Sequence, residues 1–169
     1  MATLELKLGD LFGTKADAIG HGVNTQGAMG AGIAVVFRKR HEEMYKRYRE
    51  LCKIFGDSLG GSTFLYFDEQ PGAAPLPYSY IANIFSQKQM GANAEVGLLI
   101  EGVKDAFVGL WGEQEIDSPH LAVPLIGCGI GGLDWDRDVY PALKDLTKSL
   151  PKNWDLTVVS NEPRKGFSA

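Results

Sequence analysis

Stretches typical of β-strands alternate with stretches typical of helices along most of this 169-residue chain. The most constraining of them is Leu121–Ile126, a nearly unbroken apolar run of the kind found in a central strand buried on both faces. A strand of that kind needs helices packed on each side of its sheet. The alternation therefore predicts an α/β fold with helices on both faces of the sheet.

The other elements follow from hydrophobic periodicity and from the turn residues between them. We expect a break near His41 in the first long helix, and Pro141 must lie in the first turn of the last helix or else kink it. A proline-rich surface loop is predicted over 70–77, and the polar tail 161–169 is expected to be loose, which leaves one domain over 1–160. The predicted strands are Thr3–Leu8, Ala18–Val23, Ser62–Phe67, Tyr80–Phe85, Leu121–Ile126 and Leu156–Ser160, and the predicted helices are 33–54, Glu95–Trp111 and Asp136–Leu150.

Charge and cysteine content narrow the classes of function. A net charge of −4 argues against broad nucleic-acid binding, which needs a basic face, so a nucleic-acid substrate is not the favoured partner. Cys52 and Cys128 lack metal-ligand spacing, so neither a structural metal nor a disulfide is expected. With no secretory signal in the first ten residues and no apolar run near 18 residues, we expect a cytoplasmic monomer.

Two glycine-rich segments, Thr25–Gly32 and Gly127–Gly132, each follow a predicted strand. Ligands of α/β sheets gather at these strand ends, and glycine lets backbone N–H groups approach a phosphate closely. Two such loops could clamp a diphosphate from both sides, although the glycines can equally serve only as tight turns. A dinucleotide fingerprint is missing after the first strand, and a phosphate-binding Gly-Lys-Ser/Thr motif is missing altogether.

Four ordered motifs carry a resemblance to a known family. They are Gly9-Asp10-Leu11-Phe12, His21-Gly22-Val23-Asn24, the segment 29–34, and Gly127-Cys128-Gly129 followed by Leu133-Asp134-Trp135. Together they resemble the macrodomain family, and more narrowly its branch of terminal ADP-ribose protein glycohydrolase and DNA ADP-ribosyl glycohydrolase antitoxins. The resemblance runs from about Leu4 to Ser160. It implies a three-layer α/β/α fold with a central mixed sheet, and ADP-ribose as the ligand.

The resemblance also implies a role for individual residues. Asp10 would accept a hydrogen bond from the adenine amino group beside the Leu11 backbone, and Asn24 would bind the distal ribose. From the residues alone, Asp10 can equally cap a turn and Asn24 can form an Asx turn. The other implied ligand contacts are Gly30, Ala31, Gly32, Ile33, Gln87, Gly127, Cys128, Gly129, Ile130 and Gly131.

Catalysis is where the chain departs from the related hydrolases. Their nucleophilic lysine corresponds to Gln87, with Lys88 one residue later, and the aspartate of their second glycine loop corresponds to Gly131. The candidate catalytic residues are therefore Asn24, Gly131 and Lys88. We favour attack by water on an ADP-ribosyl ester of Asp or Glu in an ADP-ribosylated protein, because a carboxylate leaves easily. A non-catalytic ADP-ribose reader and an ADP-ribose 1″-phosphate phosphatase are the alternatives.

Three other features have simpler interpretations. Cys128 has no partner base in the sequence, so we interpret it as a small loop residue rather than a nucleophile. His21 is interpreted as a core histidine. The basic run Arg38-Lys39-Arg40 is interpreted as a solvated helix face, with a supporting role near a nucleic-acid substrate as the alternative.

Overall fold

A computed structural model describes residues 1–69 and 75–169. Its six strands form one sheet in the order β1-β6-β5-β2-β4-β3. All neighbours pair in parallel except β3 and β4, which are antiparallel, so the sheet is mixed as expected. The strands are β1 (Thr3–Leu8), β2 (Ala18–Asn24), β3 (Thr63–Phe67), β4 (Tyr80–Gln87), β5 (His120–Val123) and β6 (Asp155–Ser160).

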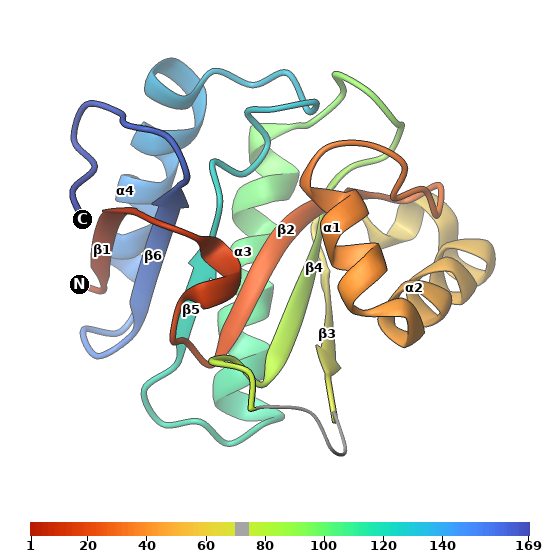
Figure 1. Ribbon diagram of the computed structural model, residues 1–169, viewed down its shortest axis with the longest axis horizontal. Coiled ribbons are helices and arrows are strands. Elements are labelled where there is room, and N and C mark those ends of the chain that lie inside the picture. Colours follow the sequence, from red (N-terminus) through yellow and green to blue (C-terminus); the bar gives the residue numbers. More distant parts are fainter. Residues whose placement is uncertain (70–74) are drawn as a thin grey trace.

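Helices cover both faces of the sheet, which confirms the predicted three layers (Figure 1). Helices α1 (Ile33–Arg40) and α2 (Glu42–Phe55) cover one face, and α3 (Val96–Gly112) and α4 (Tyr140–Ser149) cover the other. Successive strand side chains point to opposite faces, so neighbouring strand residues enter two separate cores. Within the described ranges, no helix has the length and apolarity needed to cross a membrane.

The predicted break near His41 is confirmed, because this residue ends α1 and begins α2. Its buried ring is held on both sides: Nδ1 pairs with the Asp68 carboxylate, and Nε2 lies 2.9 Å from the Tyr78 hydroxyl. The last helix is also more complex than one continuous segment. A π-helical turn, Trp135–Val139, precedes α4, and Pro141 lies in the first turn of α4, where it needs no N–H partner.

The predicted ends of two strands are wrong, and so is the expectation of a loose tail. Strand β4 runs through Gln87 instead of ending at Phe85. The central strand stops at Val123 instead of Ile126, because Pro124 has no N–H to donate to the sheet. The chain then turns tightly, and Ile126 N donates to Pro124 O at 2.7 Å. The tail is not loose, since Leu8 N donates to Ser168 O and Phe167 packs on Trp135. Most of the loop predicted over 70–77 lies outside the described residues, which resume at Pro75.

Candidate functional site

A cleft of about 1170 Å³ opens at the carboxyl ends of the central strands. Loop 1 (residues 25–32, between β2 and α1) and loop 2 (residues 124–134, after β5) both line it. The structure therefore brings together the two glycine segments that the sequence singled out. All of the expected ligand contacts line this cleft, namely Asp10, Leu11, Asn24, Gly30, Ala31, Gly32, Ile33, Gln87, Gly127, Cys128, Gly129, Ile130 and Gly131.

Asn24 shapes loop 1 through its side chain. Its Oδ1 accepts from the backbone N–H groups of Gln26 and Ala28, at 3.0 and 3.3 Å, while its Nδ2 donates to Ala28 O at 2.9 Å. This is the Asx-type turn that the sequence left open. Only the second Nδ2 hydrogen is left for a ligand, so Asn24 is first of all the residue that fixes the loop.

The start of α1 supplies unpaired backbone donors to the cleft. Gly32 precedes the helix with φ of 60°, a left-handed value that glycine adopts without strain, and no side chain caps the helix. The first N–H groups of a helix have no intrahelical acceptor, and the helix dipole adds positive potential at the same end. An anionic phosphate is the ligand that such a terminus favours.

Loop 2 contains glycines of two kinds. A Cβ on Gly131 would lie 2.7 Å from Gly127 O and 2.9 Å from Ala94 Cβ, so no side chain fits there in this backbone. The aspartate that related hydrolases place in this loop therefore has no counterpart at Gly131. Gly129, like Gly30 in loop 1, has no protein atom within 4 Å of its Cβ position, so both glycines face open space in the cleft.

The two loops touch across the cleft. A Cβ on Gly32 would lie 3.4 Å from Cδ1 of Ile130, whose side chain is half exposed. Loop 1 and loop 2 therefore come close together at Gly32 and Ile130, which both line the cleft. Glycine-rich loops at a helix start can offer backbone N–H groups to a narrow anionic group such as a diphosphate.

One end of the cleft is built around Asp10. Its Oδ1 accepts from Phe12 N at 3.1 Å, so Asp10 does cap the short turn Leu11–Gly13, and Oδ2 has no hydrogen-bond partner among the described residues. Phe12 also lines the cleft, with the Arg40 guanidinium 4.5 Å from its ring centroid. Sequence reasoning missed both as site residues, together with Arg164 from the tail.

Lys88 does not enter the cleft, contrary to the expectation for a catalytic residue. Strand β4 continues through Gln87, and Lys88 is not among the residues that line the cleft. A Cβ on Gly60 would lie 3.4 Å from Cε of Lys88, which places this side chain beside Gly60. Gln87 does line the cleft, and its Nε2 donates to Gln89 O and Gly91 O, which holds the turn after β4.

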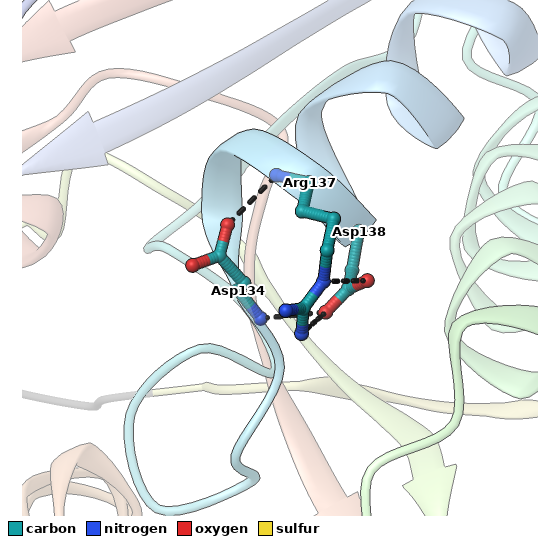
Figure 2. Close-up of polar contacts among 3 residues, drawn as sticks. All are labelled: Asp134, Arg137 and Asp138. Atoms are coloured by element: carbon teal, nitrogen blue, oxygen red, sulfur yellow. Dashed lines mark hydrogen bonds and ion pairs between the residues drawn. The ribbon is translucent and has the colours of Figure 1, made fainter.

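Asp134 caps the helical turn that follows it, and it does not stand in for the aspartate that the related hydrolases carry in this loop. Figure 2 shows its Oδ1 accepting from Arg137 N, while its own N–H donates to the Asp138 carboxylate, at 2.7 and 2.8 Å. Arg137 also binds Asp138 through its guanidinium, and this hydrogen bond lowers the pKa of the Asp138 carboxyl. The Leu133-Asp134-Trp135 motif therefore anchors the end of loop 2 to the helical turn that follows.

Cys128 and His21 both have structural roles. Burial raises the pKa of the Cys128 thiol to about 12, so the thiol is protonated at neutral pH and is a poor nucleophile. His21 is fully buried, lies 2.8 Å from Asn83 Oδ1 through Nε2, and stacks on Phe37. Across the described parts of the chain, no three His, Cys, Asp or Glu side chains gather in a group that could hold a metal ion.

Comparison with known proteins gives the family. No protein-family model matches the chain. A DNA ADP-ribosyl glycohydrolase of Mycobacterium tuberculosis is 32% identical over 161 residues, which cover 95% of this chain and 42% of that protein. The solved macrodomain of Mycobacterium tuberculosis DarG superposes with a TM-score of 0.77 at 29% identity, covering 97% of this chain and 100% of that one. The chain belongs to the macrodomain family.

A second kind of relative belongs to the same comparison. An ADP-ribose 1″-phosphate phosphatase of Meyerozyma guilliermondii is 35% identical to this macrodomain over 100 residues, which cover 54% of this chain and 57% of that protein. This macrodomain thus spans less than two thirds of either relative, and 42% of the mycobacterial glycohydrolase.

Proposed function

We propose that this macrodomain binds ADP-ribose in the cleft and hydrolyses an ADP-ribosyl linkage. The observation that carries the proposal is that two glycine-rich loops, which approach each other at Gly32 and Ile130, line the same cleft. A diphosphate is the part of ADP-ribose that needs such a clamp. The names of the relatives, a DNA ADP-ribosyl glycohydrolase and an ADP-ribose 1″-phosphate phosphatase, support the same ligand.

The cleft gives each part of ADP-ribose a place. Adenine lies at the Asp10 end, where the free Oδ2 accepts from the exocyclic amine and Phe12 offers an apolar surface. The diphosphate lies between the start of α1 and the backbone of Gly129 and Ile130. The distal ribose then reaches Asn24, Gln87 and Gly131, where its anomeric carbon, C1″, is attacked.

Water is the nucleophile in this proposal, because no lysine among the described residues lines the cleft. A water molecule held between the diphosphate and the distal ribose adds to C1″ and passes its proton to a diphosphate oxygen. The bond from C1″ to the leaving group breaks, and the leaving group keeps the electron pair. Rate acceleration comes from positioning and from fixed backbone dipoles, which can be large without a catalytic acid.

The proposal assigns no described residue of the cleft as a general acid, which favours linkages whose leaving group departs as a stable anion. An ester to Asp or Glu of a protein meets this requirement, because the carboxylate leaves without a proton. Two further candidates come from the relatives: ADP-ribose attached to DNA, and ADP-ribose 1″-phosphate. All three share the ADP-ribosyl group and differ only in what is attached to C1″.

Incubation with three substrates separates these possibilities. We would follow the release of free ADP-ribose from an ADP-ribosylated carboxyl group, from an ADP-ribosylated oligonucleotide, and from ADP-ribose 1″-phosphate, with mass spectrometry as the readout. Hydrolysis of the first two supports the proposal. Release of phosphate from the third alone identifies a phosphatase. Tight binding of ADP-ribose without release from any substrate identifies a reader and contradicts the hydrolase.

A further inference from the structure

Two arginine side chains converge on one aromatic ring beside the cleft. The guanidinium carbons of Arg38, on α1, and Arg49, on α2, lie 5.7 and 5.6 Å from the ring centroid of Tyr45. Neither arginine forms an ion pair with an acidic side chain in the parts of the chain that the structure describes. Two like charges held on the same ring, without a carboxylate between them, leave uncompensated positive potential.

Arg49 lies next to loop 1, which contributes residues to the cleft. A Cβ on Gly27, in loop 1, would lie 3.8 Å from both Cα and Cγ of Arg49. Two residues after Arg38, Arg40 lines the cleft itself. Helices α1 and α2 lie together on one side of the sheet (Figure 1), so Arg38, Arg40 and Arg49 all come from helices on that side.

The charge of the chain is strongly uneven around this point. Residues 38–53 contain seven of the 17 Lys and Arg residues and only three of the 21 Asp and Glu residues. The remainder therefore carries ten basic and eighteen acidic residues. Residues 38–53 therefore carry a net charge of +4 and the remainder −8, so the overall charge of −4 conceals a basic segment on α1 and α2 that would attract a polyanion.

We propose that Arg38, Tyr45 and Arg49 bind a backbone phosphate of a nucleic-acid strand whose ADP-ribosylated nucleotide occupies the cleft. This inference rests on the proposed function. Guanidinium groups match the geometry of phosphate oxygens and fix a strand without reading its bases. A nucleic acid carries a charge on every unit, which suits the further basic residues Arg47 and Lys53 along α2, whereas Lys46 is paired with Glu43 at 3.6 Å. An acidic peptide is the competing partner, and its charges are less regularly spaced.

The test compares a long and a short substrate. The double variant Arg38→Gln/Arg49→Gln is assayed on an ADP-ribosylated single-stranded oligonucleotide and on the corresponding ADP-ribosylated mononucleotide. We expect KM for the oligonucleotide to rise about ten-fold with kcat unchanged, while KM for the mononucleotide stays the same. The control Lys144→Gln/Lys148→Gln removes the same charge from α4 and should change neither KM. Equal effects on both substrates, or none, overturn the assignment.

Binding without hydrolysis keeps this result separate from the proposed activity. Fluorescence anisotropy at low salt with an unmodified single-stranded oligonucleotide should show binding that weakens on adding salt, more steeply for the wild type than for the Arg38/Arg49 variant. A loss of affinity in this variant alone supports the surface even if no substrate is cleaved. Undiminished binding, or a KM effect confined to an ADP-ribosylated acidic peptide, overturns the nucleic-acid partner.

Discussion

The hydroxyl of Tyr48, on α2, lies 2.6 Å from the carbonyl oxygen of Asn24 and 3.0 Å from its Oδ1. Both residues are buried. One hydrogen bond donor on a helix therefore fixes the end of β2 and the side chain that shapes loop 1. The geometry of loop 1 thus depends on a residue that does not line the cleft.

We expect Tyr48→Phe to lower the free energy of unfolding by about 1–3 kcal/mol, because a buried carbonyl loses its donor. ADP-ribose affinity should fall as loop 1 loosens. Urea denaturation and calorimetry measure the two effects. Tyr45→Phe is the control, since no described hydrogen bond involves its hydroxyl, and it should change stability by less than about 0.5 kcal/mol. A Tyr48→Phe protein as stable as the wild type would contradict this account of loop 1.

Asp10→Asn separates the capping role of Asp10 from the proposed recognition of adenine. The amide oxygen can still accept from Phe12 N, so the melting temperature should stay close to that of the wild type. Loss of the carboxylate facing the adenine amine should weaken ADP-ribose binding about ten-fold. The hypoxanthine analogue of ADP-ribose lacks this amine and should bind more weakly to the wild type than ADP-ribose does. Equal binding of ADP-ribose to both proteins would exclude the adenine contact.

Lys88→Ala should leave hydrolysis within about two-fold of the wild-type rate, because this side chain lies outside the cleft. Borohydride added during turnover should trap no covalent adduct on the protein. Mass spectrometry of the treated protein checks this directly. A stable adduct at Lys88 would overturn the water mechanism and would require the segment after β4 to rearrange.

His21 makes stability depend on pH. Burial lowers its pKa from 6.5 to about 4, so the fold favours the neutral ring, and the nearby His41 acts in the same direction. The unfolded chain takes up this proton at higher pH, so the free energy of unfolding should fall as the pH drops from 6.5 towards 4. The full shift corresponds to about 3 kcal/mol. His21→Gln should show a shallower slope in urea titrations over this range, and identical slopes would be evidence against the buried neutral ring.

Much of the fold was readable from the sequence because its signals are local. Strand alternation and helical spacing gave the elements, and glycine at strand ends gave loops 1 and 2. The early end of β5 was also readable, since a proline interrupts the run at Pro124. Arg40 lies seven residues after Ile33 on the same helix face, so its place in the cleft could have been inferred as well.

Other features depend on contacts that no local pattern records. The pairing of Lys7 with Ser168 joins opposite ends of the chain, and the polar tail has no periodicity that could predict it. The position of Lys88 depended on whether β4 stops at Ser86 or continues through Gln87, and element ends are the least certain part of a sequence-based prediction. The hydrogen bonds of the Asn24 side chain to loop 1 depend on the path of the folded loop, which the residue types alone do not determine.

Calorimetry with ADP-ribose tests most directly whether backbone amides of the two glycine loops bind the ligand. Gly129→Ala places a methyl group in the open cleft. Gly112→Ala is the control and places the same group outside the cleft, at the C-terminal end of α3. Neither methyl group meets a protein atom within 4 Å, and neither glycine has a positive φ. The account predicts that Gly129→Ala weakens binding at least about ten-fold, while Gly112→Ala binds like the wild type. Unchanged affinity in Gly129→Ala, or no binding by the wild type, would contradict it.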